Sequence, residues 1–250
     1  MLTPPSWPRH AGRRYPVLFF LHEIYGSGGS LTSHGVAAEL RARMQDGRLP
    51  EFFVIAPFAP ASWFSDSHDG RHRYEEFLAG DLIAWAESRY PVIPSSGARG
   101  VTGISMGGYG AMKIALKHPG LYGSVSTLSG ALIPFDRSED LPRYSWIARW
   151  SLKRVFGKRS DDNSLAQNDV WEILRASRFE KSPFRAHLRA GRQDVYGLDR
   201  VAVQFGSNLN EHGVDATVVL EPGRHDWAYW WRGLVEIAEW HGRQFSYDGH

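Results

Sequence analysis

Short runs of apolar residues recur along the chain and alternate with segments of helical period. The runs are continuously apolar rather than alternating, which is typical of strands covered on both faces. They occupy residues 15–22, 52–57, 99–104, 123–129, 184–190 and 215–221. Apolar side chains at spacings of three and four predict helices over 72–90 and 197–212, and a third helix is expected over 106–117. This alternation predicts an α/β fold with a mainly parallel central sheet and helices on both faces.

Residues 134–181 interrupt the alternation. The segment has no clear strand pattern, and its apolar side chains include Trp146, Ile147, Trp150, Leu152, Val155 and Phe156. Two interpretations are open, a small helical excursion packed on the core or a small cap over a pocket. Because 250 residues fit one large domain, we expect a single domain over 1–250 with this segment inside it.

The composition indicates a globular protein and excludes several functional classes. Hydrophobic residues make up 42% and aromatic residues 13% of the chain, so a disordered protein is excluded. The formal charge is only +2 and is spread along the chain, so no nucleic-acid partner is expected. No apolar run reaches the roughly 18 residues of a membrane span. The absence of cysteine excludes disulfides and thiolate nucleophiles, and a cytoplasmic location is expected.

The N-terminus shares one feature with an export signal. Arg13 and Arg14 precede an apolar stretch, as in twin-arginine signals. That stretch, 17–21, is too short for a signal core, and no small-residue cleavage site follows it. We therefore interpret it as a strand.

The pentapeptide Gly103-Ile-Ser-Met-Gly107 is the strongest candidate for chemistry. A G-x-S-x-G match carries little weight by itself in a chain with 26 glycines. Its context is specific, because it lies between a predicted strand and a predicted helix, where a nucleophile elbow is placed. Glycines are needed there because side chains would collide with the neighbouring strand and helix. The motif predicts Ser105 as a nucleophile.

A serine hydroxyl needs a base, and the base needs an acid that orients it. In the chain order Ser, Asp, His, the histidine lies on a loop after the last strand, which is the position of His225. Asp194 follows the fifth predicted strand, and enough chain for one helix and one strand separates it from His225. Asp199 would lie inside that helix, and Asp226 is too close to the base. The sequence therefore predicts Ser105, Asp194 and His225 as the catalytic residues.

Two backbone N–H groups are needed to hold the oxyanion of a tetrahedral intermediate. One is expected from Met106, which follows the nucleophile, and the other from Ile24, in the loop after the first strand. The candidate substrate-binding residues flank this loop or the expected cleft: Glu23, Tyr25, Trp63 and Trp227. For both tryptophans, core packing and pocket lining are open.

Glu23 lies next to the predicted oxyanion hole. A carboxylate facing the hole would oppose the developing negative charge by roughly 3 kcal/mol at about 6 Å and an effective dielectric near 20. We therefore expect the Glu23 side chain to point away from the hole and to be paired with a nearby Arg or His. The alternative is a solvated loop residue.

The chain resembles the putative-esterase family of α/β-hydrolases, which includes carboxylesterases, S-formylglutathione hydrolases, feruloyl and acetylxylan esterases, and mycolyltransferases. The similar segments lie between about 15 and 232 and include 15–22, 63–66, 74–77, 103–112, 191–194 and 225–227. The extended elbow that begins at Ser105 is the most specific. The resemblance implies an α/β-hydrolase fold and the same three catalytic residues. Glu23 departs from the pattern, because the family usually has glycine there.

These observations predict a serine carboxylesterase that hydrolyses short-chain acyl esters through an acyl-enzyme. Its partner is a small-molecule ester, no cofactor or metal is expected, and the oligomeric state is unknown. A feruloyl or acetylxylan esterase and an S-formylglutathione hydrolase are alternatives within the hydrolases. An acyltransferase and an inactive binding scaffold are alternatives of other classes. The glycine-rich run after Tyr25 lacks the glycine spacing of a dinucleotide-binding site and is not interpreted as one. His68 and His72 lie in a loop typical of solvated residues and are not interpreted as metal ligands.

Overall fold

The computed structural model describes residues 1–7, 9–10, 12–135, 146–157 and 164–247. Its six strands form one sheet in the order β2-β1-β3-β4-β5-β6. They are Val17–Leu21 (β1), Phe53–Ile55 (β2), Arg99–Ile104 (β3), Ser124–Leu128 (β4), Arg185–Gly191 (β5) and Asp215–Glu221 (β6). Every neighbouring pair is parallel. The predicted parallel α/β architecture is therefore confirmed.

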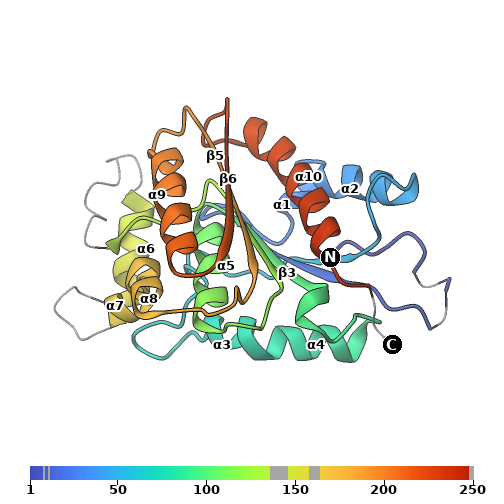
Figure 1. The fold of residues 1–250 in the computed structure, drawn as a ribbon, viewed down its shortest axis with the longest axis horizontal. Helices are drawn as coiled ribbons and strands as arrows, with labels where there is room; N and C mark the ends of the chain where they lie inside the picture. The colour runs from blue at the N-terminus through green and yellow to red at the C-terminus, as the bar shows by residue number, and fades with distance from the viewer. Residues whose placement is uncertain (8, 11, 136–145, 158–163, 248–250) are drawn as a thin grey trace.

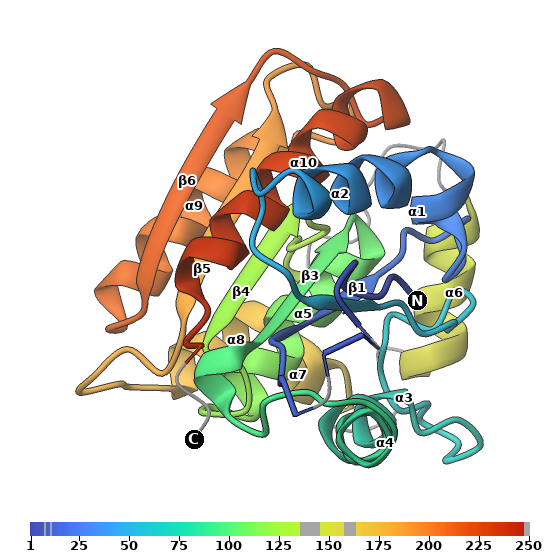
Figure 2. The same cartoon turned by 90° about the vertical axis from the view of Figure 1, so that its right-hand side faces the viewer.

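Helices cover both faces of this sheet (Figures 1 and 2). They are Ser30–Ser33 (α1), Val36–Gln45 (α2), Tyr74–Glu76 (α3), Leu82–Arg89 (α4), Met106–Lys117 (α5), Trp146–Phe156 (α6), Ser164–Asn168 (α7), Val170–Ala176 (α8), Leu198–Glu211 (α9) and Trp227–Gln244 (α10). A π-helical turn, Phe77–Asp81 (η1), joins α3 to α4, and a 3-10 turn, Ser96–Ala98 (η2), precedes β3. The helix predicted over 72–90 is thus one helical run with a π-helical turn in its middle.

Two hydrophobic clusters, one on each face of the sheet, explain the continuously apolar strands. Phe19 packs in the cluster that contains α4, α5 and α9, whereas its neighbour Phe20 packs in the cluster that contains α2 and α10. Successive side chains of a strand point to opposite faces, so a strand with helices on both sides has no face exposed to solvent.

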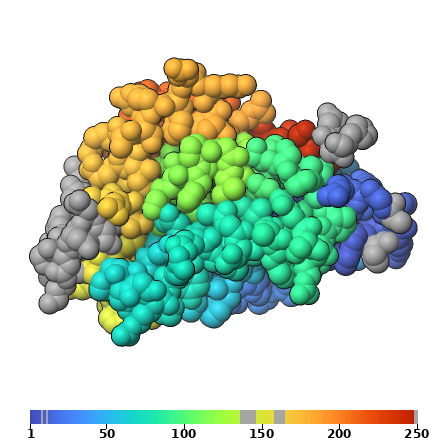
Figure 3. Space-filling view, turned by 90° about the horizontal axis from the view of Figure 1, so that it is seen from below, coloured from blue at the N-terminus to red at the C-terminus, as the bar shows by residue number. Residues whose placement is uncertain are grey.

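Figure 3 shows the molecule from the side of α3 and α4, whose teal and green atoms run across this surface.

The segment 134–181 connects β4 to β5. Residues 136–145 and 158–163 of the segment lie outside the described residues, and the rest contains α6, α7 and α8. Leu152, Val155 and Phe156 of α6 are buried in the same cluster as α5, while Trp146 and Trp150 are exposed. The described part is therefore a helical excursion packed on the core. No helix in the described ranges is long and apolar enough to cross a membrane.

The strand register brings the carboxyl ends of the central strands together. Leu21 of β1 pairs with Gly103 of β3, and Ile104 of β3 pairs with Leu128 of β4. Loops that follow parallel strands consequently meet at one edge of the sheet, which is where ligands bind in open α/β sheets.

Candidate active site

Ser105 forms a sharp turn between β3 and α5. Its backbone has φ 52° and ψ −113°, a left-handed φ that side-chain-bearing residues rarely adopt. A Cβ at Gly107 would lie 2.0 Å from the carbonyl oxygen of Leu21, and one at Gly103 would lie 2.2 Å from the carbonyl of Gly107. The two glycines of the motif are thus required by close backbone packing. The turn places Ser105 at the carboxyl end of β3 and at the N-terminus of α5.

Ser105, His225 and Asp194 form one chain of hydrogen bonds. The Ser105 Oγ lies 3.1 Å from His225 Nε2, and His225 Nδ1 lies 2.8 Å from Asp194 Oδ2. The Asp194 side chain is fully buried, and its Oδ1 accepts the Tyr196 N–H at 2.9 Å. Because a carboxylate can only accept, Nδ1 carries the proton and donates to Asp194. Nε2 is then left as the acceptor for the Ser105 hydroxyl.

Close contact between two loops holds the aspartate beside the histidine. A Cβ at Gly191 would lie 2.3 Å from the carbonyl oxygen of Gly223. The Gln193 N–H donates to that same carbonyl at 3.0 Å. The loop after β5, which carries Asp194, is therefore packed directly on the loop after β6, which carries His225.

The two other candidate acids have different positions. Asp199 lies in the first turn of α9. Asp226 caps the N-terminus of α10, where its side chain accepts the Tyr229 N–H at 3.1 Å. Only Asp194 of the three is hydrogen-bonded to His225 among the described residues.

Two aromatic rings that were not predicted pack against His225. Tyr196 and Trp230 both meet the imidazole edge to face, with centroids 4.8 Å and 4.9 Å away. Their positions depend on contacts between the loop after β5, the loop after β6 and α10. A sequence pattern carries no signal for such contacts, beyond the proximity of both residues to the predicted acid and base.

A cavity of about 170 Å³ opens at the Ser105 hydroxyl. Its lining includes the predicted residues Glu23, Ile24, Tyr25, Trp63, Ser105, Met106 and His225. Its other lining residues were not predicted: Ala131, Ile133, Ala148, Tyr196, Leu198 and Trp230. Ala148 belongs to α6, so the excursion also contributes to the wall of the cavity.

The assignment of Trp227 to substrate binding is not supported by its position. Trp227 does not line the cavity, and its ring stacks on His34 with centroids 3.8 Å apart. The reason is the direction of the first turn of α10, in which Trp230 faces His225 and Trp227 packs beside the α1 region.

The N–H groups of Met106 and Ile24 are available at the cavity. Met106 is the first residue of α5, so its N–H has no partner within the helix. Ile24 lies in the turn after β1, and within the described ranges no acceptor is found for either N–H. The N-terminus of α5 adds a positive partial charge beside Ser105.

His22 fixes the loop that contains Ile24. Its Nδ1 donates to the carbonyl oxygen of Glu23 at 2.7 Å, and its Nε2 accepts the Ala59 N–H at 3.1 Å. Burial lowers the pKa of His22, although the Glu23 carbonyl and carboxylate act in the opposite direction. The ring is therefore a neutral bridge between the loop after β1 and the loop after β2.

The expected pairing of Glu23 with an Arg or His is wrong. The residue is only 8% exposed, it lines the cavity, and its Oε2 has no hydrogen-bond partner. In the described part of the chain no cation lies within ion-pair distance of its carboxylate. The adjacent His22 cannot serve, because both of its ring nitrogens are bonded to backbone groups.

Trp63 forms a wall of the cavity and is held from two sides. Its Nε1 donates to Ser151 Oγ of α6 at 2.9 Å, and its ring meets Tyr109 of α5 edge to face at 5.4 Å. Its φ of 54° is left-handed, as is that of Phe64. Pocket lining and core packing are therefore both true of Trp63.

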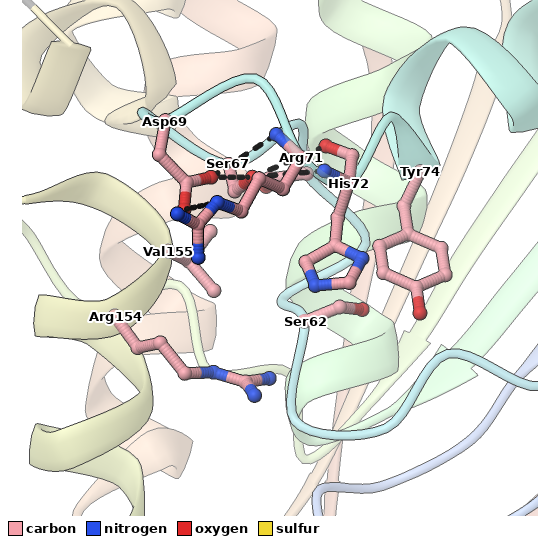
Figure 4. A pocket seen from close by; sticks show the side chains of 9 residues that line it. Ser62, Ser67, Asp69, Arg71, His72, Tyr74, Arg154 and Val155 are labelled. Carbon is pink, nitrogen blue, oxygen red and sulfur yellow. Dashed lines mark hydrogen bonds and ion pairs between the residues drawn. The ribbon is translucent and has the colours of Figure 1, made fainter.

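A second cavity, of about 200 Å³, lies between α6 and the 62–74 loop (Figure 4). Ser67 and Arg71 both contact the Asp69 carboxylate, and His72 stacks on Tyr74. These contacts shape the loop behind Trp63. Within the described residues no group of three or more His, Asp or Glu side chains could hold a metal ion.

The known proteins to which this chain is similar include several esterases. A family model described as putative esterase matches residues 1–241. An acetyl esterase of Caldicellulosiruptor saccharolyticus is 26% identical over 83% of this chain and 80% of its own length. A ferulic acid esterase structure matches with a TM-score of 0.73 at 23% identity, over 96% of this chain and 89% of its own. An S-formylglutathione hydrolase from Agrobacterium tumefaciens gives 0.76 at 17% identity, over 98% and 88%. These two structures show a shared fold.

Proposed function

The chain belongs to the putative-esterase family of α/β-hydrolases and acts on carboxylic esters, and we propose that it is a serine carboxylesterase. The observation that carries this proposal is the hydrogen-bonded chain from Ser105 Oγ through His225 to the buried Asp194 carboxylate. This series of hydrogen bonds ends at Ser105, which lines a cavity at the carboxyl edge of the sheet, where an ester can reach the serine hydroxyl.

The geometry supports a two-step acyl transfer. Ser105 Oγ attacks the ester carbonyl while His225 Nε2 takes its proton, and the same proton then protonates the departing alcohol. Asp194 holds the tautomer that makes Nε2 the acceptor and stabilises the imidazolium. The N–H groups of Met106 and Ile24 would bind the oxyanion, each contributing about 3 kcal/mol. A water molecule, deprotonated by His225, then cleaves the acyl-enzyme and releases the acid.

We infer a preference for short acyl groups. The cavity of about 170 Å³ is smaller than the roughly 300–1,000 Å³ of ordinary ligand pockets. A relative that is similar over most of both chains is an acetyl esterase. Both observations support acetate- to butyrate-sized acyl groups.

Turnover of p-nitrophenyl butyrate tests the proposal. Ser105→Ala and His225→Ala should each lower kcat by about 10⁴-fold or more, and the double variant should be scarcely worse, because the groups act as one unit. Ser88→Ala serves as a control, since Ser88 is exposed on α4. A Ser105→Ala variant that retained a tenth of the activity would overturn the proposed mechanism.

A further inference from the structure

One carboxylate oxygen of Glu23, a residue that lines the cavity, has no hydrogen-bond donor. Glu23 is 8% exposed, and its Oε2 is buried without a partner. Buried polar atoms in folded proteins are almost always hydrogen-bonded, so each orphaned atom calls for an explanation. For a buried carboxylate, the missing group is a hydrogen-bond donor or a cation.

The position of this carboxylate is built into the loop. The Glu23 carbonyl accepts the Gly26 N–H at 2.9 Å as well as the bond from the His22 ring, so its backbone is fixed. The carboxylate then lies over Gly26, where an added Cβ would come within 2.5 Å of it. Residue 26 must therefore be glycine for Glu23 to occupy this place.

The surroundings of Glu23 favour a ligand that brings the donor. Glu23 and Ser105 line the same small cavity, so the bound part of an ester at Ser105 also lies beside Glu23. The aromatic residues Trp63, Tyr196 and Trp230 also line this cavity. Aromatic faces attract cations and leave the carboxylate as the strongest acceptor for a donor on the ligand.

We propose that Glu23 is a specificity-determining residue that accepts a hydrogen bond from a hydroxyl or protonated amine on the ester substrate. The inference rests on the proposed function, because it places the ester carbonyl at Ser105. A donor bonded to Glu23 also weakens the repulsion between this carboxylate and the oxyanion. Esters that carry a carboxylate or phosphate at the same position are excluded by like charge.

Matched pairs of acetate esters test the assignment. 2-Hydroxyethyl acetate is compared with propyl acetate, and 2-(dimethylamino)ethyl acetate with its apolar isostere 3-methylbutyl acetate. Each kcat/KM is divided by the rate of alkaline hydrolysis of the same ester. The wild-type enzyme should favour the donor ester of at least one pair by about ten- to a hundredfold, the range that hydrogen bonds to a charged acceptor give. The pair that shows the preference distinguishes a neutral hydroxyl from a cation.

Variants at two positions assign the preference to the carboxylate. Glu23→Ala should reduce the preference to within about twofold, and Glu23→Gln should abolish the preference for the amine. Gly26→Ala should also reduce it, because the new Cβ displaces the carboxylate. Glu172→Gln, on the exposed surface of α8, is the matched control and should leave the ratio unchanged. Circular dichroism of each variant checks that it is folded.

The outcomes separate this inference from the proposed function. Wild-type ratios within twofold for both pairs, or a ratio that survives Glu23→Ala, would overturn the role of Glu23. If p-nitrophenyl acetate is still hydrolysed through Ser105 in that case, the proposed function stands alone. If Ser105→Ala leaves turnover intact, the proposed function and the inference that rests on it both fail.

Discussion

Glu75 offers a quantitative test of how α5, the helix that follows Ser105, is held in place. Its carboxylate lies 2.7 Å from Lys113 Nζ and 2.6 Å from Lys117 Nζ, both on α5. The Lys113 side chain is fully buried and also donates to Ser65, in the loop that carries Trp63. Glu75→Gln keeps the shape of the side chain and removes its charge, which leaves a buried ammonium without its counter-ion.

The structure gives the size of the effect. Burial alone would raise the pKa of Glu75, but Lys113 and Lys117 outweigh it and lower the pKa from 4.5 to about 2. That difference corresponds to about 3 kcal/mol at 1.36 kcal/mol per pKa unit. Breaking a buried ion pair costs about 3–5 kcal/mol in general. We expect Glu75→Gln to lower the free energy of unfolding at pH 7 by about 3 kcal/mol.

The pH dependence has a definite sign. The stabilisation by Glu75 is complete above its unfolded pKa of 4.5 and is lost as the pH falls toward about 2. Burial lowers the pKa of Lys113 from 10.5 to about 8 even with Glu75 present. The unfolded chain therefore binds more protons between these values, and stability rises with pH across this range. In Glu75→Gln the rise should begin at lower pH, so its deficit should be smaller at pH 9.5 than at pH 7.

Urea unfolding followed by tryptophan fluorescence measures the free energies. Glu172→Gln is the control, because it breaks an ion pair with Arg175 whose side chains are 48% and 68% exposed. Such pairs contribute about 0–1 kcal/mol. A Glu75→Gln variant that loses less than about 1 kcal/mol, or no more than the control, would refute this account of the buried pair.

Three further predictions concern the site. Asp194→Asn should lower kcat on p-nitrophenyl butyrate by about 10³–10⁴-fold because asparagine favours the wrong imidazole tautomer, whereas an equal loss in Asp199→Asn would contradict the assignment. Gly107→Ala should abolish folding or activity, since its Cβ would lie 2.0 Å from the Leu21 carbonyl. Gly80→Ala is the control, because a Cβ at Gly80 would have nothing within 4 Å. An unchanged melting temperature and unchanged turnover in Gly107→Ala would refute this prediction. The ratio of kcat/KM for butyrate over decanoate esters should exceed tenfold, and a ratio of one or below would reject the short-acyl preference.

The sequence was most informative where a local pattern and a steric requirement coincide. The strands β1 to β5 were predictable because nearly all of their residues are buried, and the elbow because glycines must flank Ser105. The order of strands and loops predicted that Asp194 and His225 lie close to each other. A cytoplasmic location and a single domain over 1–250 stay predictions.

The contents of the cavity were less predictable because they depend on contacts between distant segments. Trp227 and Trp230 are both in the first turn of α10, and only helix direction decides which one faces His225. The lack of a cationic partner for Glu23 among the described residues could not be predicted from nearby charges, since it depends on both nitrogens of His22 binding backbone groups. The contribution of α6 to the wall through Ala148 requires the packing of the whole excursion.

Labelling with a fluorophosphonate probe tests the central claim most directly. The reagent phosphonylates a serine only where a base activates the hydroxyl, so intact-mass and peptide mass spectrometry identify the nucleophile. The account predicts one adduct on Ser105, absent in Ser105→Ala and formed much more slowly in His225→Ala. An adduct on a different serine, or ester turnover by a protein that the probe does not modify, would contradict it.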